Sequence, residues 1–191
     1  MRHFFHRDIC IVDIECTGLD PQIHEIIQLS AVILDKTSLE EKATFDMYVR
    51  PENFENNEPE AMKVNGLTKQ FLDDRGLELS VVLKKFSDFA SQPVIMAYWS
   101  GDYVDGPFLW EAYKKTKLTN PFDYHTFNIW PLAYLYMQAH HLADNPNNQM
   151  GFLTEDVLRA FKIDALKSHN ALNDCRNEAL ILRAILDKLS V

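Results

Sequence analysis

Cysteine is scarce in this sequence: its 191 residues include three cysteines, Cys10, Cys16 and Cys175. An odd number of cysteines without a CxxC spacing argues against a disulfide framework and against a cysteine zinc site. Such sparse cysteine suits a reducing compartment, so we expect a cytoplasmic protein.

Long hydrophobic runs are also missing. The longest apolar stretches fall well short of the roughly 20 residues that a membrane-spanning helix needs. The first residues, MRHFFHRDICIVDIE, are too polar for a signal peptide and lead directly into a strand pattern. Repeats, low-complexity segments and a second-domain boundary are absent as well. We therefore expect residues 1–191 to form a single domain without a membrane partner.

Positive charge is in deficit, with 19 lysines and arginines against 28 aspartates and glutamates, a net charge of −9 and a pI near 5.2. Phosphate groups are bound mainly by Lys and Arg, so this balance argues against a high-affinity, sequence-independent nucleic-acid binder. An acidic protein can still act on nucleic acid where part of its negative charge holds metal ions. Whether this protein holds metal ions in that way depends on its sequence motifs.

Short β-favouring runs alternate with amphipathic segments along the chain. Three strands follow one another closely at residues 9–15, 25–35 and 43–49, which predicts an antiparallel meander. The later pattern predicts strands at 94–99 and 124–128, short helical pieces over 59–73, helices at 80–91, 103–117, 129–142, 154–161 and 170–189, and a loop at 143–151. We therefore expect an α/β fold in which helices flank a mixed five-stranded sheet.

Two carboxylates stand on the first predicted strand. Asp13 and Glu15 are two residues apart, so their side chains point to the same face. Both lie among apolar residues, where an unpaired carboxylate is costly. One interpretation is that they hydrate a solvated face. The other is that they bind a cation, because neither face of this strand is polar overall, and the pair alone does not decide between the two.

A third carboxylate lies in the sequence SGDYVDGPFLW. The pattern predicts a helix that begins near Tyr103. Asp102 is then the N-cap, and Asp105 is the third helical residue. Asp105 precedes Phe108 and Leu109 by three and four positions, so it shares their inward face. Asp102 is the competing candidate, because it too could reach a metal from the strand end. We favour Asp105 on the face argument.

The remaining candidates lie in the sequence SHNALNDCRNEA. Asp174 falls in the second turn of the last predicted helix, beside the apolar stripe through Cys175. His169 precedes that helix, and an imidazole is the side chain that titrates near neutrality. A histidine ahead of a helix is often only a surface residue, so neither residue is decisive by itself.

Taken together, these segments resemble the DEDDh exonucleases, which include the proofreading subunit of bacterial replicases, RNase T and oligoribonuclease. The run DIECTGLD, from Asp13 to Asp20, resembles their first motif, with Cys16 where threonine is usual. The run VDGPFL resembles the second motif. His169, followed five residues later by Asp174, resembles the third. The resemblance covers nearly the whole chain in order, although Gly101 stands where relatives often carry Asn.

The resemblance implies a ribonuclease H-like fold and hydrolysis by two Mg²⁺ or Mn²⁺ ions per site. Hard ions of this kind suit oxygen ligands, and two of them would balance the charge of four carboxylates. It further implies that Asp13 bridges both ions and that Glu15 and Asp174 complete one site. Asp105 would act through ordered water, and His169 would be the general base that deprotonates the attacking water.

The resemblance also implies a substrate: the 3′ end of single-stranded DNA or RNA, from which nucleoside 5′-monophosphates are released. Thr17, Gly18 and Leu19 would present backbone and an apolar wedge to the terminal nucleotide, or form a plain strand-to-turn junction.

The sequence leaves the choice between a DNA and an RNA substrate open. It also leaves open whether the protein forms a homodimer or associates with a polymerase. The alternative function is a catalytically inactive scaffold of the same fold that binds nucleic acid or a partner. The presence of all five candidate residues disfavours it.

Overall fold

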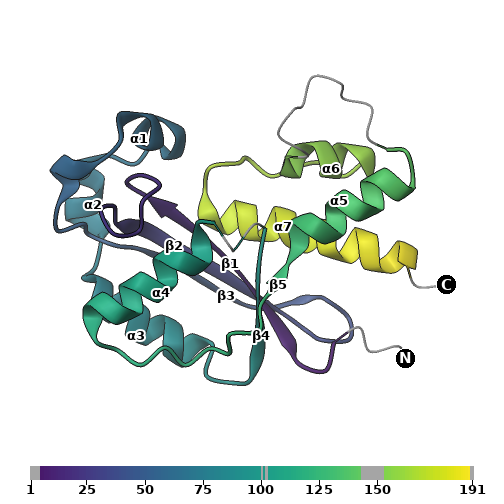
Figure 1. The fold of residues 1–191 in the computed structure, drawn as a ribbon, viewed down its shortest axis with the longest axis horizontal. Helices are drawn as coiled ribbons and strands as arrows, with labels where there is room; N and C mark the ends of the chain where they lie inside the picture. The colour runs from purple at the N-terminus through teal and green to yellow at the C-terminus, as the bar shows by residue number, and fades with distance from the viewer. Residues whose placement is uncertain (1–4, 100, 102, 143–152, 190–191) are drawn as a thin grey trace.

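A mixed five-stranded sheet forms the centre of the molecule in the computed structural model, which describes residues 5–99, 101, 103–142 and 153–189 (Figure 1). The strand order is β3-β2-β1-β4-β5. The strands are β1 (Asp8–Cys16), β2 (Ile26–Leu34), β3 (Glu41–Tyr48), β4 (Val94–Tyr98) and β5 (Phe127–Asn128). The first three pair antiparallel, β4 runs parallel to β1, and β5 runs parallel to β4. The predicted sheet, with its antiparallel first half, is confirmed.

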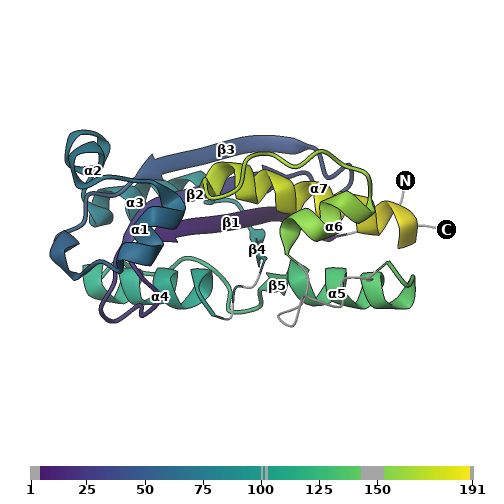
Figure 2. The ribbon, with the colours of Figure 1, turned by 90° about the horizontal axis from the view of Figure 1, so that it is seen from above.

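Helices cover both faces of this sheet. They are α1 (Pro59–Asn65), α2 (Lys69–Arg75), α3 (Leu79–Phe89), α4 (Asp105–Thr116), α5 (Ile129–Ala139), α6 (Thr154–Ala160) and α7 (Ala171–Leu189), with a short 3-10 turn at Phe54–Asn56. The pair α3 and α4 lies on one side, and α5, α6 and α7 group together on the other (Figures 1 and 2). Among the described helices, none is both long and apolar enough to cross a membrane. The predicted loop at 143–151 lies outside the described residues.

Strand β1 is buried on both faces because its alternate side chains enter two different hydrophobic clusters. Cys10, Val12 and Ile14 pack on the side of α3 and α4. Ile9 and Ile11 pack on the side of α5, α6 and α7. Each fully buried aliphatic side chain of this kind stabilises the fold by about 1.5–3 kcal/mol. The two-residue period therefore continues the second face into Asp13 and Glu15, and directs both carboxylates toward α7.

Strand β4 accompanies β1 along only part of its length. Their parallel pairing runs from Asp8 opposite Val94 to Ile11 opposite Ala97. Beyond Ile11, β1 keeps β2 as its partner, and no other described strand pairs with its second edge. In open α/β sheets, ligands bind outside the carboxyl ends of the parallel strands. The carboxyl end of β1 is therefore where a site is expected.

Candidate metal and catalytic site

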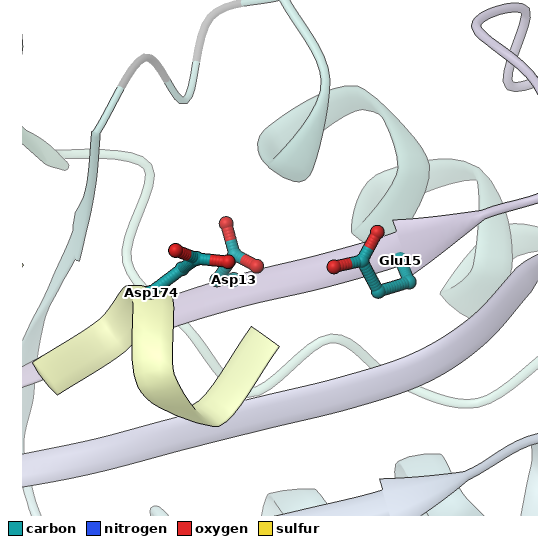
Figure 3. A group of neighbouring side chains, drawn as sticks. All are labelled: Asp13, Glu15 and Asp174. Carbon is teal, nitrogen blue, oxygen red and sulfur yellow. The ribbon is translucent and has the colours of Figure 1, made fainter. Parts of the chain in front are cut away.

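Three of the predicted carboxylates converge at the carboxyl end of β1 (Figure 3). Asp13 and Glu15 come from β1 and Asp174 from the start of α7, and one oxygen atom from each lies within 4.8 Å of the other two. Packing of α7 across β1 and β2 brings these opposite ends of the chain together. The structure thus assembles three residues that the sequence placed in two separate motifs.

The start of α7 fixes the direction of the Asp174 carboxylate. Asn170 immediately precedes the helix, and its Oδ1 accepts a hydrogen bond of 3.2 Å from the backbone amide of Asn173. Asp174 returns the interaction, because its Oδ2 accepts from the backbone amide of Asn170 at 3.1 Å. The first amides of a helix have no partner within the helix, and these side chains provide one.

Repulsion and burial act together on the carboxylates of β1. Burial, followed by the charges of Asp174 and Asp105, raises the pKa of Glu15 to about 7. Burial also raises the pKa of Asp13 well above its ordinary value, and neighbouring carboxylates led by Asp105 add to the effect. Acidic groups that raise one another's pKa in this way are stabilised by a bound cation. The observation therefore favours the cation-binding interpretation of the Asp13 and Glu15 pair.

Asp105 lies beside this group of three and outside it. Helix α4 begins at Asp105, with Val104 as its N-cap, so the predicted place of Asp105 as the third helical residue is wrong. The predicted inward face is confirmed, because Asp105, Phe108 and Leu109 are all buried. Asp102, the competing candidate, lies outside the described residues, and its contribution stays a prediction.

The Asp105 carboxylate meets β1 at the edge that β4 leaves free. Burial raises its pKa to about 7, while backbone hydrogen bonds from Ile14 and from Asp105 itself act in the opposite direction. The amide of Ile14 is available because the pairing of β1 with β4 stops at Ile11. The early end of this strand pairing therefore makes room for Asp105 next to Asp13.

His169 stands in the segment that leads into α7, with an exposed side chain. Its backbone has a φ of 60°, in the left-handed region that non-glycine residues adopt uncommonly. Burial raises the pKa of Asp174, whereas the backbone amides of Asn170 and His169 and the imidazole of His169 act in the opposite direction. The structure therefore places His169 next to the acidic cluster and within reach of solvent.

The turn after β1 contains the three predicted substrate-binding residues. Thr17 is held twice by Glu25: its backbone amide donates to the Glu25 carbonyl at 2.9 Å, and its Oγ1 accepts from the Glu25 amide at 2.9 Å. Gly18 packs against His24 so closely that a Cβ atom would lie 2.5 Å from the imidazole ring. Leu19 is 56% exposed. The turn is held in place by these contacts and exposes two large apolar side chains, Leu19 and Ile23, to solvent.

The sequence analysis missed a polar row on β2 and β3 beside the cluster. Ser30 and Gln28 are the register partners of Asp13 and Glu15. Both are buried, and both donate to Oδ1 of Asp46, at 2.7 Å from Ser30 and 2.8 Å from Gln28. The signal was present, because Gln28 and Ser30 repeat with a period of two within an otherwise apolar run.

The fold and the site together define an α/β protein with a carboxylate cluster that could hold a cation at the carboxyl end of its central strand, β1. The model of the RNase T family, which is described as an exonuclease family, matches residues 10–182 of the chain. The chain therefore belongs to the RNase T exonuclease family, and the family resemblance found in the sequence is confirmed. Membership in this family indicates a nuclease of the hydrolase class.

The curated relatives of the chain are longer proteins, and the match covers only part of each. The chain is similar to human 3′-5′ exoribonuclease 1, with 38% identity over 89 residues that cover 44% of this chain and 25% of that protein. It is also similar to the PolC-type DNA polymerase III of Thermotoga petrophila, with 22% identity over 194 residues that cover 97% of this chain and 12% of that protein. The chain thus spans a quarter or less of the length of these relatives.

Solved structures show the same fold. Exonuclease I from Methylocaldum szegediense superposes with a TM-score of 0.81 at 18% identity, over 95% of this chain and 41% of that one. The E. coli exonuclease I complex with single-stranded DNA gives a TM-score of 0.80 at 15% identity, over 96% of this chain and 41% of that one. The cell-death related nuclease CRN-4 gives 0.78 at 16% identity, over 95% of this chain and 64% of that one. The predicted ribonuclease H-like fold is confirmed.

Proposed function

We propose that this chain is a metal-dependent 3′–5′ exonuclease. It hydrolyses phosphodiester bonds at the 3′ end of single-stranded nucleic acid and releases nucleoside 5′-monophosphates. The observation that carries the proposal is the convergence of Asp13, Glu15 and Asp174 within 4.8 Å of one another. Support for a single-stranded substrate comes from the fold, which is shared with exonuclease I structures that hold single-stranded DNA.

The donor atoms of the site fit hard divalent cations. All three clustered side chains offer carboxylate oxygen, the ligand that Mg²⁺ and Mn²⁺ prefer. Bound cations would stabilise the charge on the attacking and leaving oxygens of the phosphodiester. We propose two ions per site, held by Asp13, Glu15 and Asp174. Asp105 supports them from the start of α4, where it already acts on Asp13 and Glu15.

His169 is the proposed general base. Its exposed side chain is accessible to the attacking water, and it stands beside Asp174 at the entry to α7. A neutral imidazole can accept a proton from water at physiological pH. The left-handed backbone at His169 turns the segment sharply next to the cluster. This role requires that the segment before α7 be held in place. Two hydrogen bonds between the side chain of Asn177 in α7 and the backbone of Leu166 hold it.

Leu19 is the proposed contact for the terminal base. It is exposed, and its turn directly follows Cys16, the last residue of β1. Stacking or wedging against a base stabilises single-stranded complexes without strong sequence preference. The net charge of −9 offers little attraction to a long phosphate backbone, which favours short strands. The same chemistry serves DNA and RNA, so the choice between them is left to experiment.

The test uses a 5′-labelled single-stranded DNA and the RNA of the same sequence, each with Mg²⁺, Mn²⁺ or EDTA. We expect a ladder that shortens from the 3′ end, that EDTA abolishes, and that the Asp13→Asn variant lacks. Asp187→Asn is the matched control, because it removes the same charge from an exposed position of α7. A strand blocked at its 3′ end should resist degradation, whereas a block at the 5′ end should have no effect.

Failure to cleave either strand with either metal, by protein shown to be folded, would contradict this proposal. The inactive scaffold that binds nucleic acid or a partner would then be the better account. Cleavage of only one of the two strands would assign the substrate class.

A further inference from the structure

Glu178 is a buried carboxylate that the proposed chemistry does not use. It lies one helical turn after Asp174 in α7 and is 2% exposed. Its neighbours on the same face, Cys175 three residues before it and Leu182 four residues after it, are fully buried in the cluster that α7 forms with β1 and β2. Glu178 therefore points from α7 toward the sheet, on the same side of β1 as Asp13.

Within the described part of the chain, Glu178 occupies this place without a compensating positive charge. Its Oε2 atom is buried and has no hydrogen-bond partner among the described residues. The charged groups that act on it are Asp105 and Asp174, both acidic, and together with burial they raise its pKa well above the ordinary value. Glu178 in turn raises the pKa of Asp13. A bare carboxylate is among the most unfavourable groups to bury, so an apolar residue would pack better at this position.

We propose that Glu178 is a fifth carboxylate of the cation site. From its buried position in α7, one helical turn beyond Asp174, it increases the affinity of the site for divalent cations. The inference rests on the proposed function. Glu178 is a positioning residue in this scheme, since it acts on the cations and does not touch the substrate.

The scheme predicts effects of opposite sign in the two states of the protein. In the metal-free protein a charge on Glu178 would be buried beside Asp105 and Asp174, so ionisation of this side chain destabilises the fold. In the loaded protein the same charge attracts the cations, so it strengthens their binding. A residue that served packing alone would affect stability in the same direction in both states and would leave the affinity for cations unchanged.

The experiment compares the full chain with Glu178→Gln, which keeps the shape and removes the charge, and with Glu178→Met, which is apolar and of similar volume. The Kd for Mn²⁺ is measured by calorimetry, the number of bound ions by electron paramagnetic resonance, and the melting midpoint in EDTA by calorimetric scanning. We expect both variants to bind Mn²⁺ at least about tenfold more weakly. We also expect both to melt several degrees higher in EDTA. Asp187→Asn, the exposed control in the same helix, should change neither quantity.

An unchanged Kd for Mn²⁺ in both variants would overturn the inference, whatever happened to activity. If the original chain bound Mn²⁺ and degraded strands while both variants bound it equally well, the inference alone would fail. If the original chain bound no Mn²⁺, the proposed function and the inference would fail together.

Discussion

The side chain of Asn177 forms two hydrogen bonds with the backbone of Leu166: its Oδ1 accepts from the Leu166 amide at 2.9 Å, and its Nδ2 donates to the Leu166 carbonyl at 3.2 Å. Asn177 lies in α7 and is fully buried. Leu166 comes three residues before His169. The pair therefore fastens the segment that carries the proposed general base to the helix that carries Asp174.

We predict that Asn177→Ala lowers activity through His169. Loss of both hydrogen bonds should reduce the free energy of unfolding by about 1–3 kcal/mol. It should reduce kcat by roughly tenfold, with a smaller change in KM, because the imidazole is held less well for proton transfer. The measurement is steady-state cleavage at a temperature where circular dichroism shows the variant to be folded.

The control for this prediction is a double-mutant cycle with His169→Ala. In the His169→Ala background, Asn177→Ala should reduce kcat very little further, because the group that it positions is already gone. An equal loss of kcat in both backgrounds would mean that Asn177 contributes to stability alone.

Glu15 should make the metal-free protein less stable as the pH rises. Its ordinary pKa is 4.5, and burial with the nearby charges of Asp174 and Asp105 raises it to about 7 in the folded state. Between these values the folded protein holds a proton that the unfolded chain has released, so the stability is fully present below about pH 4.5 and is lost as the pH rises through about 7. The expected loss from Glu15 is on the order of 2–3 kcal/mol, and Asp105, raised to about 7, acts in the same direction.

Urea unfolding in EDTA, at several pH values across this window, measures the effect. The Glu15→Gln variant should show a flatter dependence, because one of the groups responsible has been removed. Asp187→Asn, at its exposed position, should retain the full slope. A stability that rose between pH 5 and pH 7 in EDTA would contradict the prediction.

Divalent cations should reverse this dependence on pH. Carboxylates bind metal in their deprotonated form, so affinity should rise with pH through about 7, and binding at lower pH should release protons. We expect millimolar Mn²⁺ to raise the melting midpoint clearly near pH 8 and hardly at all near pH 5. Titration calorimetry in two buffers of different ionisation enthalpy counts the released protons. A count of zero near pH 6 would show that the carboxylates with raised pKa are not the ligands.

Leu19 should affect substrate binding without affecting stability. The chain offers a matched control in Ile23, which lies in the same turn and is also 56% exposed. We expect Leu19→Ala to raise KM for a single-stranded oligonucleotide by roughly fivefold, equivalent to about 1 kcal/mol of lost apolar contact. Both variants should unfold within about 0.5 kcal/mol of the original chain. Equal increases in KM for Leu19→Ala and Ile23→Ala would argue against a specific role for Leu19.

The sequence alone determined the features that depend on local periodicity. The two-residue period of a strand places Asp13 and Glu15 on one face, and the ends of the first four strands lie within two residues of their predicted positions. The order of the three motifs identified the family. The single domain, the cytoplasmic location and the catalytic roles of the site residues stay predictions.

Only the tertiary structure decided which side chains meet. The proximity of Asp174 to Asp13 depends on how α7 crosses β1 and β2, and local propensity does not encode that packing. Glu178 falls on an apolar stripe of α7, where the sequence favours a hydrophobic side chain, and its position beside Asp105 and Asp174 becomes visible only in the tertiary structure. Helix α4 starts at Asp105, two residues after the predicted start, and its first carboxylate lies beside the part of β1 that β4 leaves unpaired, which the local sequence does not reveal. The physical reason is the same in each case: burial and charge depend on groups that are distant in the chain, whereas periodicity depends on adjacent ones.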